Sequence, residues 1–238
     1  MCQLMAIPTI TASAPLPITA GEQPKRLIVV GAGGCGREIM QWAFDVAACG
    51  QAPWHPYGFI DDNPQVLEGK SSVAPYLGTI QGWQPHPEEL FVMGIADPKI
   101  KRRLVALLQS RGARFTGLVH PSALVAATAT VGQGVVLCPY GVISANSTVG
   151  DFVLVNIYSC ICHDAQVGDY STISNHCDLT GGVTLGAEVF VGSHSSIIPG
   201  ITVGAGAYLG AGSVVVRPVP AGAKVVGVPA RPIAPTAG

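Results

Sequence analysis

Residues 185–204 read LGAEVFVGSHSSIIPGITVG, and an aliphatic side chain recurs in them at every sixth position. The same period extends in both directions, over seventeen consecutive hexads within residues 118–219. An α-helix repeats about every 3.6 residues and a flat strand every two, so neither explains this period. A period of six is typical of a parallel β-helix, in which each hexad supplies one short strand and one corner. The aliphatic positions are Val119, Val125, Val131, Leu137, Ile143, Val149, Val155, Ile161, Val167, Ile173, Leu179, Leu185, Val191, Ile197, Val203, Leu209 and Val215.

A second set of residues, most of them small, recurs four positions after each aliphatic residue, from Ala123 to Val219. Because alternate residues of a strand point the same way, both sets are predicted to face inward. Residues eighteen apart are expected to stack on successive coils. Glycine often follows the aliphatic residue directly, and we attribute it to backbone angles that other residues avoid. These glycines are Gly132, Gly150, Gly168, Gly186, Gly192, Gly204 and Gly210.

The composition excludes several classes of protein. Charged residues make up 11% of the 238 residues, against about 25% in ordinary soluble domains. The net charge of −1 and the lack of Lys/Arg clusters argue against a nucleic-acid partner. No apolar run approaches the roughly 20 residues that a membrane-spanning helix needs. Low charge with high apolar content suggests that one face of the solenoid is buried between subunits.

The seven cysteines include no CxxC pair, and only Cys160 and Cys162 lie close together in sequence. Neighbouring positions on one strand do not pair easily as a disulfide. We expect reduced thiols in a cytoplasmic protein, rather than disulfides or a metal site.

The chain before the hexads divides into two parts. Residues 1–24 lack a basic n-region and a continuous apolar core, so they are expected to form a disordered leader rather than a signal peptide. Residues 25–117 are predicted to form a Rossmann-like α/β domain. Its first strand, residues 26–30, runs into the glycine loop 31–36, which fits G-x-G-x-x-G, and then into a helix over residues 37–48.

The glycine loop favours nucleotide binding. Glycines let phosphates approach the backbone amides, and the helix N-terminus attracts their negative charge. A second predicted strand, residues 57–60, ends at Asp61 and Asp62, which are placed to bind a ribose or sugar hydroxyl. The alternative is a merely structural turn.

The rest of this domain limits the ligand. A third strand is predicted over residues 90–95 and a basic helix over 99–111. Arg102 and Arg103 of this helix are expected to form a solvated face, with a phosphate clamp as the alternative. The domain is too short for a complete dinucleotide fold, which favours one nucleotide over NAD. Residues 220–238 leave the repeat and are predicted to cap the open end of the solenoid.

His163 is the strongest candidate for chemistry. Histidine is the usual general base near neutral pH, and His163 lies at a predicted corner, directly before Asp164. The residues eighteen positions away are Gly181 and Ala145, too small to cover the imidazole. The amide of Gly181 is a candidate oxyanion donor. The alternative is an exposed histidine without a catalytic role.

Two further histidines, His176 and His194, are eighteen apart and are predicted to stack, with Tyr158 one coil earlier. We expect a structural stack at a subunit interface rather than half of a metal site. Asn156 lies seven residues before His163 at a predicted corner. Asparagine at such a corner usually stabilises a turn.

The hexads, the segment VNIYSCICHDAQVGDYSTIS (155–174) and the C-terminal VPAGAKVVGVPARPI (219–233) resemble the hexapeptide-repeat acyltransferases. With the glycine-loop domain in front, the chain is similar to the bacterial sugar acyltransferase family. That family includes sialic-acid O-acetyltransferases and N-acetyltransferases of nucleotide-linked 4-amino-4,6-dideoxy sugars. The resemblance covers about residues 25–233.

The resemblance implies a left-handed β-helix and a homotrimer, with acetyl-CoA bound along the groove between adjacent solenoids. It implies that His163 is the catalytic base, that Asp164 orients it, and that the Gly181 amide faces the thioester carbonyl. It assigns the nucleotide-sugar pocket to Gly31, Gly33, Gly34, Cys35, Asp61 and Asp62, and adds Asn156 to the substrate site. It assigns the acetyl-CoA contacts to Thr172, Gly181, Gly192, Ser193 and Ala211. Some members carry histidine where this chain has Cys35 and Thr172.

We therefore expect a cytoplasmic N-acetyltransferase of polysaccharide biosynthesis that moves acetyl from acetyl-CoA to the amine of a nucleotide-linked amino-deoxy sugar. No metal, membrane or nucleic-acid partner is expected. The first alternative is O-acetylation of a sialic acid or related sugar. A metal-dependent lyase like the γ-class carbonic anhydrases is a less favoured alternative, and a non-catalytic nucleotide-binding scaffold is another.

Overall fold

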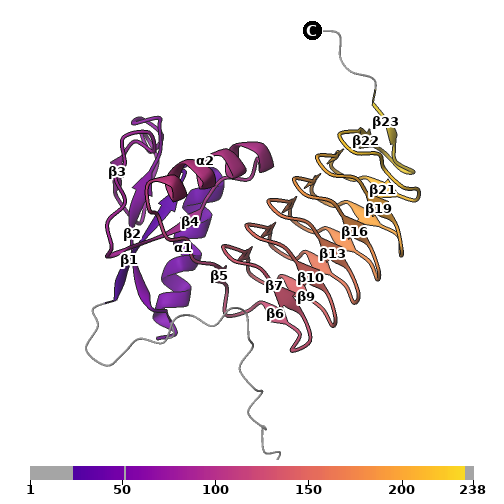
Figure 1. Cartoon of the computed structure of the whole chain (residues 1–238), viewed down its shortest axis with the longest axis horizontal. Helices are drawn as coiled ribbons and strands as arrows, with labels where there is room; N and C mark the ends of the chain where they lie inside the picture. The colour runs from indigo at the N-terminus through magenta and orange to yellow at the C-terminus, as the bar shows by residue number, and fades with distance from the viewer. Residues whose placement is uncertain (1–23, 51, 234–238) are drawn as a thin grey trace, which may run out of the picture.

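The computed structural model describes residues 24–50 and 52–233. The predicted leader, residues 1–24, lies outside the described residues except for its last position. The predicted fold class is confirmed: an α/β domain stands at one end of a parallel β-helix (Figure 1). Neither described helix is long and apolar enough to cross a membrane.

The N-terminal domain is built on a four-stranded parallel sheet with the order β3-β2-β1-β4. Three of its strands and both helices match the sequence prediction. The three-residue strand β3 was missed, because so short a segment has no measurable alternation. The elements are β1 (Lys25–Val30), α1 (Gly34–Ala48), β2 (Trp54–Ile60), β3 (Tyr76–Gly78), β4 (Glu89–Met93) and α2 (Pro98–Ser110).

The solenoid contains seventeen two-residue strands, β5 to β21, and the second residue of every strand is one of the seventeen predicted aliphatic residues. They are β5 (Leu118–Val119), β6 (Leu124–Val125), β7 (Thr130–Val131), β8 (Val136–Leu137), β9 (Val142–Ile143), β10 (Thr148–Val149), β11 (Leu154–Val155), β12 (Cys160–Ile161), β13 (Gln166–Val167), β14 (Thr172–Ile173), β15 (Asp178–Leu179), β16 (Thr184–Leu185), β17 (Phe190–Val191), β18 (Ser196–Ile197), β19 (Thr202–Val203), β20 (Tyr208–Leu209) and β21 (Val214–Val215).

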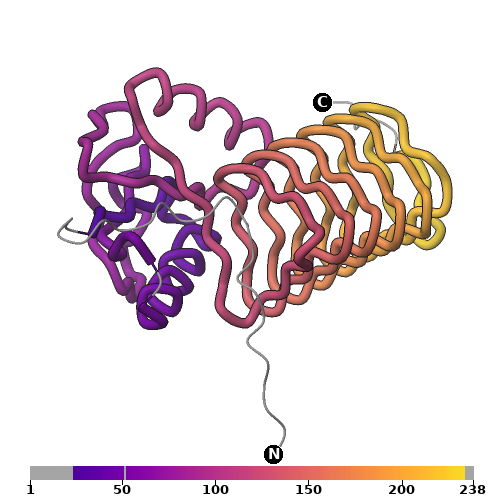
Figure 2. The backbone as a smooth tube through the Cα atoms, turned by 60° about the horizontal axis from the view of Figure 1, so that its bottom comes forward, coloured from indigo at the N-terminus to yellow at the C-terminus, as the bar shows by residue number. Residues whose placement is uncertain are grey.

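Within the solenoid, strands eighteen residues apart pair in parallel, as in the pair Cys160↔Asp178. This stacking gives three sheets, which we name after their first strands: the β5 sheet, the β6 sheet and the β7 sheet. Figure 2 shows the successive coils stacked in line. The aliphatic residues and the small residues of the second set form one continuous core along the solenoid axis.

The structure corrects the role predicted for the glycines that follow the aliphatic residues. None of those seven glycines has a positive φ. They are required by space, because a Cβ at Gly168 would lie 2.5 Å from the amide nitrogen of Ala187 on the next coil. The left-handed backbone position lies two residues further on, at the third residue after the aliphatic one. Non-glycine residues there are Tyr140, Asn146, Phe152, Tyr158, Asp164, Tyr170, His176, Glu188 and His194.

The N-terminal domain packs on the outer face of the β5 sheet. Val136, Cys138 and Leu154 of that face share a core with Ile39 and Met40 of α1. This apolar junction extends the N-terminal core onto the solenoid, so the two parts of the described chain are in direct contact.

A polar contact adds to this junction. Lys101 of α2 is only 1% exposed, and its Nζ donates to Ser171 O and Thr172 Oγ1, each at 3.1 Å. Its neighbours Arg102 and Arg103 are exposed, as predicted, and Arg102 forms an ion pair with Glu188 at 3.2 Å. The basic helix is therefore solvated along one side and anchored to the solenoid by its one buried lysine.

The C-terminal segment continues the β5 sheet beyond the hexads. Strand β22 (Lys224–Val226) pairs in parallel with β20, and β23 (Arg231–Pro232) pairs antiparallel with β22. The antiparallel strand covers an edge that would otherwise offer unpaired backbone groups.

Candidate active site

His163 lies at the corner between β12 and β13, where the chain passes from the β6 sheet to the β7 sheet. Its side chain is 67% exposed, and its Nδ1 lies 2.8 Å from Asp164 Oδ2. Asp164 occupies the left-handed corner position with a φ of 61°. The local backbone thus brings two consecutive side chains together, which strand residues of opposite orientation could not do.

The carboxylate of Asp164 selects the tautomer of the His163 imidazole. Its hydrogen bond with His163 lowers the pKa of Asp164; loss of solvation opposes this to a smaller extent, and a hydrogen bond from Asn146 adds a still smaller lowering effect. An ionised carboxylate only accepts hydrogen bonds, so Nδ1 of His163 is the donor. The lone pair of Nε2 is then left to accept a proton.

The next coil leaves room for this ring because residue 181 is glycine. A Cβ on Gly181 would lie 2.6 Å from His163 Nε2 and would also overlap Cε1. The amide of Gly182 donates to His163 O at 3.0 Å, whereas no hydrogen bond to the Gly181 amide occurs among the described residues. A base nitrogen and an unpaired backbone donor therefore lie side by side, as acyl transfer through an oxyanion requires.

The four glycines of the loop between β1 and α1 divide into two pairs. Gly31 has a φ of 96°, and a Cβ on Gly36 would overlap Gly31 O, so these two shape the turn. A Cβ on Gly33 or Gly34 would meet nothing within 4 Å. The open side of the loop is thus at the N-terminus of α1, where backbone amides and the helix dipole favour an anion.

The predicted acidic residues after β2 brace this region. Asp61 Oδ2 accepts from Ala32 N at 2.8 Å, which ties the carboxylate to the glycine loop. Asp62 Oδ1 accepts from Gln81 N at 2.9 Å. The structure therefore brings Asp61 to the glycine loop, while Asp62 holds a different segment.

Cys35 lies at the start of α1, beside the buried junction. Burial raises the pKa of its thiol to about 11. Burial disfavours the charged form of an amine as well, so it lowers the pKa of Lys101 to about 7. The Cys35 thiol is therefore a neutral group at neutral pH rather than a thiolate nucleophile.

Thr172 does not have the role expected for it. It is 1% exposed, its Oγ1 donates to Ala96 O at 2.6 Å, and it accepts from Lys101. The hydroxyl is committed to the domain junction, so we withdraw Thr172 from the expected acetyl-CoA contacts. The physical reason is that α2 packs over this part of the β5 sheet.

Apart from Gly181, the remaining expected contacts lie at another corner of the solenoid, between the β5 and β6 sheets. Asn156 follows β11, and its Oδ1 accepts from Ile157 N at 2.8 Å. Ser193 follows β17 and Ala211 follows β20 at the equivalent place, while Gly192 is buried against Ala211 of the next coil. A single chain therefore does not bring these residues to His163.

The predicted histidine stack is present and longer than expected. Tyr140, Tyr158, His176 and His194 form one continuous ladder, with ring centroids 4.7–5.2 Å apart. Within the described part of the chain, the group of three close metal-type side chains contains no histidine. The three-histidine centre of the lyase alternative is therefore not formed within residues 24–50 and 52–233.

Two residues at these sites were missed from the sequence. Asn146 lies eighteen residues before Asp164, so the coil period was a usable signal for their contact. Lys101 had no such signal, because its partners on the solenoid lie 70 and 71 residues away.

Comparisons with known proteins agree with this geometry. A family model described as the PglD N-terminal domain matches residues 26–108. The acetyltransferase domain of PglB from Neisseria gonorrhoeae FA1090 is 30% identical, with a TM-score of 0.78, over 88% of this chain and 100% of that one. No curated protein matches the chain.

Two further solved structures are similar. PerB from Caulobacter crescentus, in complex with CoA and GDP-perosamine, is 28% identical with a TM-score of 0.74, over 87% of this chain and 97% of that one. WeeI from Acinetobacter baumannii AYE is 27% identical with a TM-score of 0.77, over 88% of this chain and 100% of that one.

The fold and these structural matches define a hexapeptide-repeat acetyltransferase. The chain belongs to the sugar N-acetyltransferase family with a PglD-type N-terminal domain. It is an enzyme, which removes the non-catalytic scaffold from the alternatives.

Proposed function

We propose that this enzyme transfers acetyl from acetyl-CoA to the amine of a nucleotide-linked amino-deoxy sugar, with His163 as the general base. The observation that carries the proposal is the corner at which the His163 ring lies against Gly181 and is held by Asp164. Both reaction partners have precedents among relatives: PglB has been solved with acetyl coenzyme A, and PerB with CoA and GDP-perosamine.

The reaction needs no covalent enzyme intermediate. The sugar nitrogen attacks the thioester carbonyl carbon while Nε2 of His163 removes a proton from that nitrogen. The carbonyl oxygen becomes an oxyanion facing the Gly181 amide. The C–S bond then breaks, and the CoA thiolate takes up the proton held by His163, which restores the neutral imidazole. Asp164 stabilises the imidazolium through Nδ1. A base of this kind contributes about 10²–10⁴-fold to the rate.

The nucleotide of the substrate is proposed to bind the N-terminal domain. The unobstructed side of Gly33 and Gly34, at the start of α1, suits a phosphate. Asp61 holds this loop in shape through the Ala32 amide. The sugar amine must then extend toward a His163 corner, so the nucleotide serves as the handle that positions the nitrogen.

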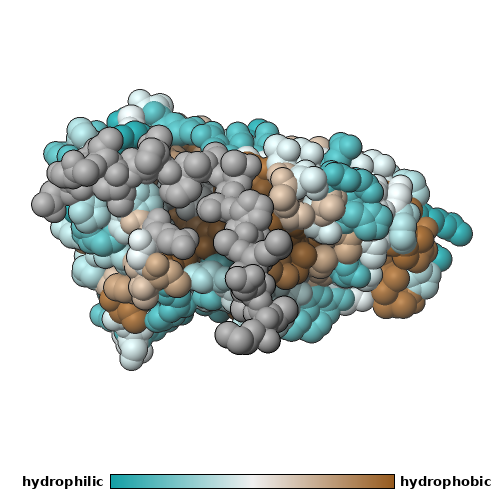
Figure 3. Space-filling model, turned by 90° about the horizontal axis from the view of Figure 1, so that it is seen from below, coloured by the Kyte–Doolittle hydropathy of each residue, from teal (hydrophilic) through white to brown (hydrophobic). Residues whose placement is uncertain are grey.

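We further propose a homotrimer, with each acetyl-CoA lying between two solenoids. Asn156, Ser193 and Ala211 lie at a different corner from His163, so a neighbouring copy would supply one side of the site. Apolar surface in the centre of one face and at the C-terminal end of the solenoid (Figure 3) fits burial between subunits. Exposed apolar side chains include Leu124, Tyr140, Tyr158, Val226 and Val228.

The cytoplasmic location and the role in polysaccharide biosynthesis are part of the same proposal, because both are inferred from the proposed substrates, acetyl-CoA and a nucleotide-linked sugar. O-acetylation of a sugar hydroxyl is the alternative that uses the same base and donor. It differs in the acceptor atom and does not require a nucleoside diphosphate.

A substrate panel tests the proposal. UDP-, dTDP- and GDP-linked amino sugars, the matching free sugars and a sialic acid are each incubated with acetyl-CoA, and CoA thiol release is measured. We expect turnover with at least one nucleotide-linked amino sugar and an amide product by mass spectrometry. Turnover confined to free sialic acid, with an ester product, would replace the proposal by its alternative.

A further inference from the structure

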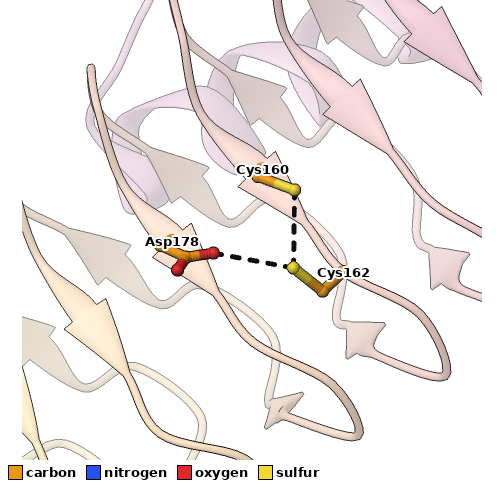
Figure 4. Close-up of side chains that lie close together, drawn as sticks. All are labelled: Cys160, Cys162 and Asp178. Carbon is orange, nitrogen blue, oxygen red and sulfur yellow. Dashed lines mark hydrogen bonds between the residues drawn. The ribbon is translucent and has the colours of Figure 1, made fainter.

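Two cysteines and one aspartate meet on the outer face of the β6 sheet, apart from the groups used in the proposed reaction. Cys160 of β12 and Cys162, directly after that strand, flank the core residue Ile161, so both point outward. Asp178 pairs with Cys160 in the adjacent strand β15. Figure 4 shows the three side chains directed toward one another.

The distances suit a single metal ion. Cys160 Sγ lies 3.5 Å from Cys162 Sγ, and Cys162 Sγ lies 3.6 Å from Asp178 Oδ1. The three ligand atoms all lie within 4.8 Å of one another. In a tetrahedral zinc site with Zn–S bonds of about 2.3 Å, two sulfurs are about 3.8 Å apart. The observed Sγ–Sγ distance is therefore close to the distance between two sulfur ligands of a tetrahedral zinc ion.

The chemistry of the donors selects the kind of ion. Two thiolates and one carboxylate suit a thiophilic divalent cation rather than Mg²⁺ or Ca²⁺, which prefer oxygen ligands. Both cysteines are free and half-buried, and Asp178 is exposed on the single chain. Three protein ligands leave a fourth position to water.

Protonation of the thiols competes with binding of the ion. Burial, the neighbouring Cys160 thiol and the charge of Asp178 raise the pKa of Cys162 to about 12. Crowded anionic donors thus resist ionisation while no cation is present. A bound divalent cation reverses this preference and deprotonates its thiol ligands.

We propose that Cys160, Cys162 and Asp178 form a binding site for a thiophilic divalent cation such as Zn²⁺ or Cd²⁺. The sequence alone led us to expect reduced thiols rather than a metal site, because it contains no CxxC pair. Asp178 completes the set because it lies eighteen residues after Cys160 and stacks on the next coil.

The test uses the intact, fully reduced protein in chelator-free buffer, titrated with Cd²⁺ alone. The ultraviolet band of cadmium–thiolate bonds is expected to saturate at one equivalent per chain. It should disappear in the Cys160→Ser/Cys162→Ser double variant, and Asp178→Asn should weaken binding about tenfold. Binding should strengthen as pH rises, since the ion displaces protons.

The matched controls are Cys49→Ser, which removes an exposed described cysteine, and Cys2→Ser, which removes one outside the described residues. Neither should change the band. Absence of the band in the wild type, its persistence in the double variant, or its loss in Cys49→Ser would overturn the proposal.

A second measurement does not depend on the variants folding. Wild-type protein is alkylated with iodoacetamide with and without Cd²⁺, and each cysteine is quantified by peptide mass spectrometry. Cys160 and Cys162 should be protected at least tenfold by the ion, and Cys49 should not. Equal labelling of Cys160 and Cys162 in both samples would contradict the site. Neither measurement involves acetyl-CoA or a sugar, so their outcome is independent of the proposed function.

Discussion

The imidazole of His163 lies directly against Gly181 of the next coil, so that a single methyl group at residue 181 would fall 2.6 Å from Nε2. Eighteen-residue stacking makes this contact, and glycine alone permits it. The proposed base therefore depends on a residue that has no side chain, which gives the first prediction.

Gly181→Ala should displace the His163 ring and lower kcat/KM by about 10²-fold, as expected for a misplacement on the order of 1 Å. Thermal unfolding should change little, because the ring is exposed and can move into solvent. Ala145→Gly, on the other neighbouring coil, is the control and should keep most of the wild-type kcat/KM. Equal activity of Gly181→Ala and wild type would show that the ring position is not critical.

Asp164→Asn should lower kcat while leaving the fold intact. The amide can donate to Nδ1, which would favour the wrong tautomer of His163. We expect a loss of about 10²-fold, smaller than the about 10⁴-fold for a buried carboxylate partner, because this pair is exposed to solvent. Steady-state kinetics with saturating acetyl-CoA measure it. A loss confined to KM would argue instead for a role of Asp164 in substrate binding.

Lys101 should make stability depend on pH. Its folded pKa of about 7 lies below the ordinary lysine pKa of 10.5, so between these pH values the unfolded state binds more protons. Stability should therefore rise as pH increases from about 7 toward 10. Lys101→Met should flatten the rise in the thermal midpoint over this range. Lys99→Met, an exposed lysine on the same helix, should preserve it; identical pH profiles for Lys101→Met and wild type would contradict the buried, neutralised amine.

The corrected role of the solenoid glycines predicts a contrast between two positions. At Gly186 a Cβ would lie 2.5 Å from the Ala205 amide nitrogen, so Gly186→Ala should destabilise by about 1–3 kcal/mol through overpacking. Gly206 has a φ of 67° and open space around it. Gly206→Asn should have little effect, because Glu188, eighteen residues earlier at the same corner, already has a left-handed backbone with a φ of 59°. Thermal unfolding compares the two; the reverse order would restore the original backbone-angle explanation.

The hexads predicted the solenoid well because every hexad places an aliphatic residue at the same inward-facing position. They also predicted the surroundings of His163, since stacking partners follow from the coil period. Asn146 and Asp164 are also eighteen residues apart, as are Cys160 and Asp178. The coil period could therefore have predicted both contacts, but we did not predict either from the sequence. Contacts across the domain junction could not be predicted from the sequence, because Lys101 lies outside the hexad repeat that contains Thr172. Their pairing depends on how α2 packs on the β5 sheet.

The central claim is that His163 is the base for acetyl transfer. The direct test measures CoA release by wild type and His163→Ala with acetyl-CoA and the best nucleotide-linked amino sugar from the panel. Circular dichroism and the oligomeric state verify that the variant is folded. We predict a fall in kcat of about 10²–10⁴-fold with little change in thermal stability. Near-normal turnover by a folded His163→Ala enzyme would contradict the account.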